Sequence, residues 1–506
     1  MNKELSDTIR SSLVYLLLVY VIAVLLYNAS LVQIRPVVLI IFAIVLGVLG
    51  IALQPKWKKV HVPHWLAYLA VGLAIFVRVL PYLYTSVPLG YDPGIHAFAF
   101  SHPFSEDWIK SVFPLPFLLL FSGITMLVGT YAVLVPVFIA FSASTVVAVY
   151  LIVRRLYSKD AAVIASILFA ISITQFETFW YNYYKNVIGI LVLLFSLLFI
   201  EDNDRFHWQL IITGVLIGGT HQVALFLFGA TYIVLISWSA FKRTRKQNFW
   251  ALGNGVLMVG LICLTNYDRI FALFLPQLLA TVTGFAGGAG GGSFFDVTSY
   301  ALLSLVYIPF AIIGVWHWRA RPGVSVMGLI ATTMVIASFF AYNRFISYLD
   351  IFVIIFASLG MLTVITSTKR IGAFIVYGLL ALGAMQAFAH ANNSLPLISD
   401  AEWHSIQTIN SEIEANATVL ATDKYYGAWL KGWVDRPIVS PGLFNDNKMH
   451  RSEWDDFWNY TNREEYLKRY PRPLYIHVGE VQPQYTFGGC YELAENSTSV
   501  LYNNTC

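Results

Sequence analysis

Apolar runs long enough to cross a lipid bilayer recur along roughly the first 390 residues, with short polar segments between them. About 20 apolar residues in a helix span the hydrocarbon core, where only helices and closed barrels satisfy every backbone group. The pattern therefore predicts a polytopic α-helical membrane protein with about 13 spans. The expected spans lie near residues 12–27, 37–53, 65–84, 130–153, 161–176, 187–200, 209–221, 223–240, 249–265, 300–317, 323–341, 347–366 and 371–389.

The basic residues predict how these spans are oriented. With a cytoplasmic N-terminus, seventeen Lys and Arg residues fall in cytoplasmic segments and only five in the outer loops before residue 390. Cytoplasmic loops carry the excess of positive charge in membrane proteins, so this imbalance favours that orientation. The apolar run 112–129 is not counted as a span, because counting it would place Arg154 and Arg155 outside. We expect that run, and the short run 271–282, to be re-entrant or interfacial.

The composition turns polar near residue 391, which predicts two domains. Residues 1–390 would form the transmembrane domain, and residues 391–506 a small extracytoplasmic α/β domain. The segment 401–415 has helical spacing, while "ATVLA", "RPIV" and "PLYIHVG" are typical of short strands. Acceptor triplets for N-glycosylation, which fit an extracytoplasmic location, begin at Asn28, Asn392, Asn416, Asn459, Asn496 and Asn503. Cys490 and Cys506 lie in this tail and are candidates for a disulfide.

The overall composition supports a location in the cell membrane. Hydrophobic residues make up 58% of the 506 residues and charged residues 12%, which excludes a water-soluble fold. The formal net charge of +4 gives no indication of a nucleic-acid partner. Membrane lipids are the expected surroundings of a multi-pass chain of this kind.

The stretch "GYDPGIH" places Asp92 and His96 in the outer loop that follows the third expected span. A purely structural interpretation is that Asp92 caps a helix that begins at Pro93, since aspartate suits the N-cap and proline the first helical position. A spacing of four residues then brings Asp92 and His96 to one face of the helix. The functional interpretation makes Asp92 a general base, with His96 as a second catalytic group or only an interfacial histidine.

A metal site is the alternative role for Asp92. Carboxylate oxygens are the ligands that Mg²⁺ and Mn²⁺ prefer, and further carboxylates occur in the outer loops. The candidate ligands of a divalent cation are Asp92, Glu106, Asp107 and Glu177.

Two cations in the outer loops are candidates for binding a phosphate. Lys185 lies among aromatic residues at the start of one span, and Arg344 at the start of another. Arginine can bind two phosphate oxygens at once, although either side chain could instead extend to lipid head groups. Arg78 and His221 are polar residues at membrane depth and therefore further candidates for this site.

Several of these stretches resemble the GT-C superfamily of integral-membrane glycosyltransferases, over roughly residues 65–366. "GYDPGIH" resembles the Asp-Pro-x-x-His/Asn stretch in an early outer loop of oligosaccharyltransferases, where the aspartate helps to bind a divalent metal. "YLIVRRLYSKDAAVIASILFAIS" and "YNRFISYLDIFVIIFASLGML" are similar to segments of the mannosyltransferase-like branch of this superfamily, which includes protein O-mannosyltransferases, lipid A aminoarabinose transferases and oligosaccharyltransferases. The resemblance implies a GT-C-like fold, with Asp92 as the acidic motif and Arg344 at the donor phosphate.

The resemblance also implies the reaction. The expected donor is a sugar on a polyprenyl phosphate or diphosphate, transferred with inversion to a protein, glycan or lipid acceptor on the extracytoplasmic side. Lys185 falls near the place of a second acidic motif in oligosaccharyltransferases, and their Trp-Trp-Asp-Tyr-Gly motif is absent. These differences favour a single-sugar transferase over oligosaccharyltransferase-type transfer to protein. A non-enzymatic transporter or flippase of lipid-linked sugars is the alternative from another class.

Overall fold

The computed structural model describes most of the chain after residue 61. Described are residues 62–504 except 107–108, 110–111, 182, 202–204, 241–243, 268–269, 271–275, 277–296, 305, 318–320, 338–341, 369, 422–423, 441–452, 454–466, 480–490 and 494–499. Several expectations therefore lie outside the described residues. They concern the spans 12–27 and 37–53, nearly all of the run 271–282, Asp107, and the pairing of Cys490 with Cys506.

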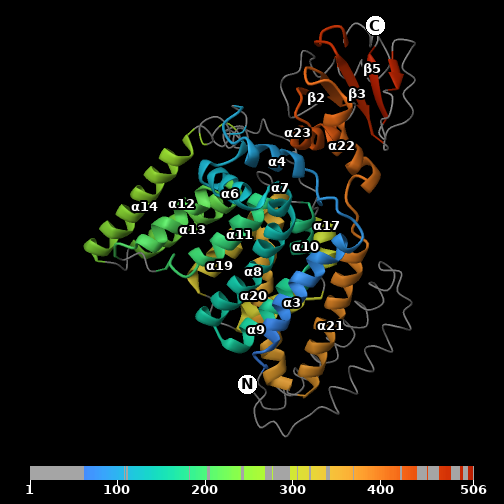
Figure 1. Ribbon diagram of the computed structural model, residues 1–506. Coiled ribbons are helices and arrows are strands. Elements are labelled where there is room, and N and C mark those ends of the chain that lie inside the picture. Colours follow the sequence, from blue (N-terminus) through green and yellow to red (C-terminus); the bar gives the residue numbers. More distant parts are fainter. Residues whose placement is uncertain are drawn as a thin grey trace, which may run out of the picture.

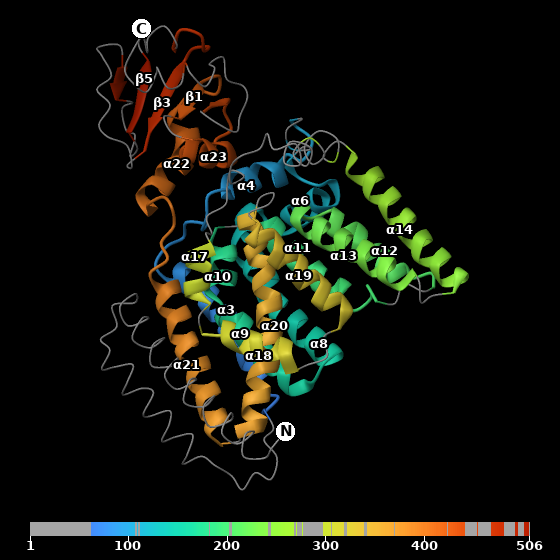
Figure 2. The ribbon, with the colours of Figure 1, turned by 180° about the vertical axis from the view of Figure 1, so that it is seen from behind.

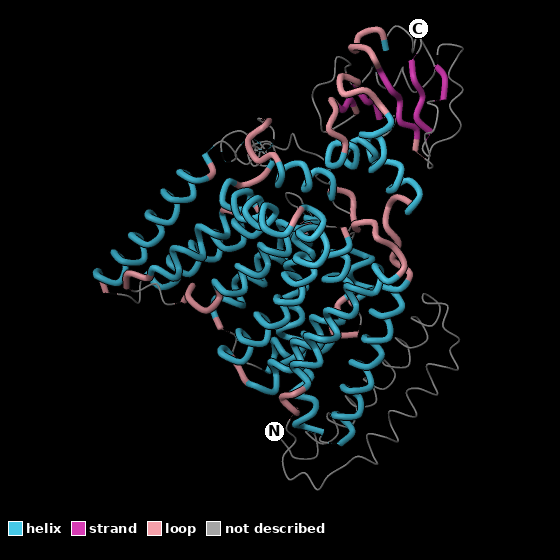
Figure 3. The backbone as a smooth tube through the Cα atoms, in the orientation of Figure 1, coloured by secondary structure: helices cyan, strands magenta, loops and turns pink. Residues whose placement is uncertain are grey.

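Helices form almost all of the described chain before residue 393 (Figures 1 and 3). They are α3 (Leu66–Val79), η1 (Leu80–Leu83), α4 (Pro93–Ser101), α6 (Leu115–Val128), α7 (Thr130–Ala132), η2 (Val133–Val137), α8 (Phe138–Leu156), α9 (Lys159–Ile171), α10 (Ile173–Trp180), α11 (Tyr184–Ser196), α12 (Trp208–Gly218), α13 (Gln222–Ala240), α14 (Arg245–Thr265), α17 (Val297–Leu303), α18 (Ile308–His317), α19 (Pro322–Ile336), α20 (Tyr342–Thr368) and α21 (Arg370–Asn392).

Five continuous helical stretches in the described part are long and apolar enough to cross a membrane. They are Leu66–Leu83, Thr130–Leu156, Lys246–Thr265, Asn343–Ser367 and Arg370–Asn392. The pair α9 and α10 passes the same test when taken together, although it bends by 48°. The chain is thus a multi-pass membrane protein, whereas the total of 13 spans stays a prediction, as do the sidedness and the cytoplasmic N-terminus.

The bend lies within the expected span 161–176, which is not one straight helix. Ser172 ends α9 and caps α10, because its side chain accepts a hydrogen bond from the Gln175 amide at 3.2 Å. A serine that caps a new helix inside an apolar segment breaks the helix, while the mean hydropathy of the segment stays that of a membrane span. The run 112–129, expected to be re-entrant or interfacial, contains the 14-residue helix α6, shorter than a usual span.

Helix α20 lies at the centre of the bundle, and most of its described side chains are buried. It crosses α18 at two glycines that bring the backbones into contact. A Cβ atom added to Gly314 would lie 3.0 Å from the Gly360 amide nitrogen, and one added to Gly360 would lie 3.0 Å from that of Gly314. Small residues at such crossings let membrane helices pack closely where lipid offers no hydrophobic driving force. The core of the bundle therefore fixes the position of α20.

The C-terminal region, residues 400–504, contains helices and a mixed sheet. The helices are α22 (Asp400–Glu412) and α23 (Lys424–Trp433), and the strands are β1 (Thr418–Ala421), β2 (Ile438–Val439), β3 (Leu474–Val478), β4 (Tyr491–Leu493) and β5 (Val500–Asn504). The strand order is β2-β1-β3-β5-β4. Strand β1 pairs in parallel with β2 and β3, while β5 is antiparallel to β3 and β4. Figure 2 shows α23 and α22 between this sheet and the helical bundle.

Three tryptophan rings form the centre of the helical side of this region. Trp403 lies edge-on to Trp429 and Trp433, at 5.6 Å and 4.5 Å between ring centroids, and Trp429 is fully buried. Buried aromatic rings of this size contribute much of the hydrophobic free energy of a small core. The aromatic stretch 424–433 thus packs this core, and it also contacts the helical bundle, as described below.

Candidate active site

Asp92 stands at the N-terminus of α4, as the sequence predicts. Its carbonyl oxygen accepts the first helical hydrogen bond, from the His96 amide at 3.0 Å, and Pro93 occupies the first helical position. Gly90 precedes it with φ of 92°, a left-handed conformation that glycine adopts at little cost. All residues of α4 are described, and the Asp92 carboxylate makes no capping hydrogen bond with any backbone amide of this helix. The capping interpretation is therefore wrong for the side chain, which remains available for other partners.

Lys185 and Arg344 are the cations whose charges reach Asp92. Lys185 is in the first turn of α11 and Arg344 in the first turn of α20, so helix ends from three parts of the chain converge here. Burial raises the pKa of the Asp92 carboxyl above its usual value, while the positive charges of Lys185 and Arg344 lower it. Because charge interactions weaken with distance, the three groups belong to one electrostatic neighbourhood.

Lys185 is positioned by contacts with the segment before α6. Its Nζ atom donates to the Val112 carbonyl at 3.1 Å and lies 4.8 Å from the centroid of the Phe113 ring. A cation above an aromatic face is held electrostatically by the ring. The ammonium group is thus anchored near Asp92.

His96 points into an aromatic cluster. Its ring lies 5.2–5.6 Å from the centroids of Phe100, Phe113 and Tyr184, and the residue is 3% exposed. Burial, together with the nearby charge of Lys185, lowers the pKa of His96 to about 3. The imidazole is therefore neutral at physiological pH and packs in the core next to the site. Its catalytic role stays a prediction.

Arg78 and His221 are both buried and held by contacts within the bundle. The Arg78 Nε atom donates to the Ser142 hydroxyl at 2.5 Å, and its guanidinium lies 5.7 Å from the Phe179 ring. Arg78 thus points inward and does not extend toward lipid. The His221 Nδ1 atom accepts from the Val223 amide at 3.2 Å. These contacts give each side chain a structural function, and their roles at a donor phosphate stay predictions.

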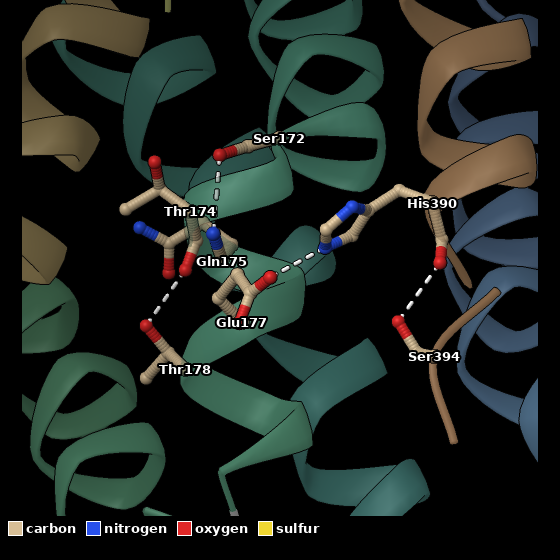
Figure 4. A network of polar contacts seen from close by, with 7 residues as sticks. All are labelled: Ser172, Thr174, Gln175, Glu177, Thr178, His390 and Ser394. Carbon is tan, nitrogen blue, oxygen red and sulfur yellow. Dashed lines mark hydrogen bonds and ion pairs between the residues drawn. The ribbon is translucent and has the colours of Figure 1, made fainter. Parts of the chain in front are cut away.

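Glu106 and Glu177, the two described carboxylates among the other proposed metal ligands, have basic partners. Glu106 forms an ion pair of 2.5 Å with Lys431 of α23, and Glu177 of α10 pairs with His390 of α21 (Figure 4). Within the described ranges, no three His, Cys, Asp or Glu residues gather to hold a metal ion. Asp92 itself has two cations nearby, which disfavour a divalent cation. The described residues do not fit a metal site built from Asp92, Glu106 and Glu177.

One buried polar cluster was not singled out from the sequence. Asp350 of α20 is fully buried, and its carboxylate accepts hydrogen bonds from Tyr307, Ser172 and Gln175, at 2.5, 2.7 and 3.0 Å. An acidic residue inside an expected span is the signal that would have found it, because charges at membrane depth are rare without a reason. In this part of the sequence only Arg344, six residues earlier, was predicted to be a functional residue.

Comparisons with solved structures give the fold, while no family model and no curated protein sequence matches the chain. The oligosaccharyltransferase AglB of Archaeoglobus fulgidus, solved with an inhibitory peptide and a dolichol-phosphate, aligns with a TM-score of 0.54 and 13% identity over 81% of this chain and 69% of AglB. ArnT of Cupriavidus metallidurans, solved with undecaprenyl phosphate, aligns with a TM-score of 0.57 and 11% identity over 87% of this chain and 97% of ArnT.

A third structure is the Archaeoglobus enzyme in complex with Zn and sulfate, which aligns with a TM-score of 0.50 and 15% identity over 81% of this chain and 68% of that chain. All three are GT-C glycosyltransferases. The chain therefore has the GT-C fold that the sequence resemblance implies. Identities of this size show the fold alone.

Proposed function

We propose that the protein is a membrane glycosyltransferase that moves a sugar from a polyprenyl-phosphate donor to an acceptor on the extracytoplasmic side, with inversion at the anomeric carbon. The observation that carries this proposal is the packing of the start of α4, which bears Asp92, against the start of α11, which bears Lys185, since the rings of His96 and Tyr184 lie 5.2 Å apart. The charges of Lys185 and of Arg344, at the start of α20, both act on the Asp92 carboxyl, which agrees with this. The fold supports it, because ArnT and AglB share it and were solved with polyprenyl phosphates.

In the proposed reaction, Lys185 and Arg344 hold the phosphate of the donor, whose lipid tail lies among the helices. Asp92 accepts the proton of an acceptor hydroxyl or amide while that nucleophile attacks the anomeric carbon. The bond between this carbon and the phosphate oxygen breaks, and its electron pair leaves with the polyprenyl phosphate. The two cations stabilise the negative charge that develops on this leaving group.

The first prediction distinguishes the catalytic role of Asp92 from the role of the two cations in binding the donor. In purified full-length protein in nanodiscs, Asp92→Asn should lower kcat roughly 10²- to 10⁴-fold, because a general base is lost. Its affinity for undecaprenyl phosphate should stay within about twofold of wild type, whereas Lys185→Gln and Arg344→Gln should weaken it roughly tenfold each, by loss of a charge-assisted hydrogen bond. Binding is measured by titration, and kcat with undecaprenyl-phosphate sugars and a panel of peptide, glycan and lipid acceptors.

Asp435→Asn is the matched control, since Asp435 is an exposed aspartate of the C-terminal region. Full transfer by folded Asp92→Asn would contradict the proposal. Mass spectrometry of the product separates single-sugar transfer from oligosaccharide transfer to protein. Movement of a labelled polyprenyl-phosphate sugar between leaflets, with no transfer to any acceptor, would instead indicate a flippase.

A further inference from the structure

The segment that leads to Asp92 is docked on the C-terminal region. Val87 is fully buried in the hydrophobic cluster that contains Trp403 and Trp429. The hydroxyl of Thr85 donates to the Asp400 carboxylate at 2.9 Å, and the Ser86 amide reaches the same oxygen at 3.4 Å. The chain is thus held by the C-terminal region five residues before Asp92.

Helix α4, which follows Asp92, crosses α23 with almost no space between the backbones. A Cβ atom on Gly94 would collide with the Ala428 carbonyl and lie 2.8 Å from the Trp429 Cα atom. A Cβ atom on Gly432 would lie 2.5 Å from the Gly94 carbonyl oxygen. Ala428 and Gly432 are four residues apart, so they lie on one face of α23 and accommodate Gly94. Figures 1 and 2 both show α4 directly below α23.

An ion pair adds a polar contact beside this crossing. Lys431 of α23 contacts Glu106 at 2.5 Å, and its ammonium lies 4.4 Å from the Phe98 ring of α4. The Lys431 side chain is only 9% exposed and that of Glu106 is 29% exposed, so the ammonium group is largely removed from water and the carboxylate only in part. Such a pair favours one position of α23 relative to the segment that follows α4, because each charge needs its partner in that place.

We propose that the C-terminal region sets the position of the Asp92 carboxylate, so that the active centre is built jointly by this region and the helical bundle. The inference rests on the proposed role of Asp92 as general base. Docked contacts bracket Asp92, with Val87 before it and Gly94 after it. Lys185 and Arg344 instead belong to α11 and α20 of the bundle. Docking of the C-terminal region therefore acts together with the packing of α4 on the bundle, where the rings of His96 and Tyr184 lie 5.2 Å apart, to fix where the acid lies relative to the cations.

Substitution of the glycine at the crossing tests this inference. Gly432→Ala places a methyl group against the backbone of Gly94, so α4 and α23 must move apart and the docked position of α4 is lost. We expect kcat to fall about 10²-fold, as for an ångström-scale displacement of a catalytic group. Undecaprenyl phosphate affinity should stay within about twofold, since both cations lie on other helices. A general loss of structure would lower both quantities. Gly72→Ala is the matched control, because a Cβ atom there meets nothing within 4 Å.

A charge exchange keeps the test informative if Gly432→Ala does not fold. Lys431→Glu should lower kcat with little effect on lipid binding, and the double variant Lys431→Glu with Glu106→Lys should restore at least part of it. Wild-type kcat in folded Gly432→Ala, or in folded Lys431→Glu, would overturn the inference. If Asp92→Asn is inactive in the same assay, that result leaves the proposed function standing, whereas an active Asp92→Asn would remove the proposed function itself.

Discussion

The Asp92 carboxyl is subject to two opposing influences, and their balance sets the pH range in which it can act. Burial raises its pKa, and Lys185 and Arg344 lower it without cancelling the effect of burial. A general base works only when ionised, so activity is lost as the pH falls through this raised pKa. The acidic limb of the rate profile should therefore lie above the pKa of an ordinary aspartate.

Removal of one cation should move that limb in a defined direction. Arg344→Gln takes away a charge that lowers the pKa of Asp92, so the acidic limb of kcat should shift to higher pH. The measurement is kcat against pH at saturating donor. Arg155→Gln, which removes an exposed cation from the last turn of α8, should leave the profile unchanged. An acidic limb at the same pH in Arg344→Gln as in wild type would show that the two groups are not coupled.

Single residues also show where sequence reasoning ends. "GYDPGIH" predicts a helix that starts at Asp92, and the backbone confirms it, because proline and aspartate have strong local preferences. The pKa of the Asp92 carboxyl depends on burial and on charges nearly 100 and 250 residues away in sequence, which no local pattern contains. His96 has the predicted spacing from Asp92, but its environment is decided by aromatic rings from α4, α11 and the segment before α6.

The break between α9 and α10 is joined to the central helix by the Asp350 cluster. Ser172 and Gln175, at the start of α10, donate to one carboxylate oxygen of Asp350, and Tyr307, just before α18, donates to the other. Thr178 adds a hydrogen bond of 2.9 Å to Ser347 of α20. The broken helix is thereby held against α20 by buried polar contacts.

Removal of the Asp350 carboxylate should destabilise the fold. Asp350→Ala leaves three buried donors without their acceptor, and each such loss costs roughly 1–3 kcal/mol, so we expect the free energy of unfolding to fall by about 3 kcal/mol or more. Ser358→Ala should cost less than about 1 kcal/mol, since this equally buried hydroxyl bonds only to a carbonyl of its own helix. Thermal and denaturant unfolding in detergent measure both. Equal stability of the two variants would contradict the structural role of the cluster.

Among the elements, the most regular helices were the most predictable. The expected span 371–389 lies inside α21, and 347–366 lies inside α20, because hydropathy alone identifies a long apolar helix. The expected span 161–176 differs because a single serine side chain caps a new helix inside it. Hydropathy does not detect such a break. The spacing of Ser172 and Gln175, a serine three residues before a glutamine, is nevertheless a weak signal of a helix start.

The sidedness of the whole molecule, predicted from its basic residues, can be measured directly. In a variant with Cys263, Cys490 and Cys506 replaced by serine, Ser411→Cys should react with a membrane-impermeant maleimide on intact cells. Arg155→Cys should react only after permeabilisation, because its end of α8 is predicted to be cytoplasmic. Both positions are exposed in the fold, so burial does not explain a difference. The reverse labelling pattern would invert the predicted topology.

For the whole molecule, the basic residues predict that Asp92, Lys185 and Arg344 share one side of the membrane, and this sidedness stays a prediction. The sequence did not predict which partners the other carboxylates have. The pairing of Glu106 with Lys431 and of Glu177 with His390 joins positions more than 200 residues apart. Such pairings follow from how α23 and α21 pack and have no signature in local spacing.

The contacts around Val87 and Gly94 also bear on how such a chain can be re-engineered. A composition change near residue 391 suggests a natural cut for building chimaeras with other transferases. The glycine crossing and the buried Val87 show that a foreign C-terminal half would meet a mismatched docking surface at that cut. Residues 85–106 would have to be exchanged together with the C-terminal half. The unit that can be exchanged between such proteins is therefore made of two separate segments of the sequence.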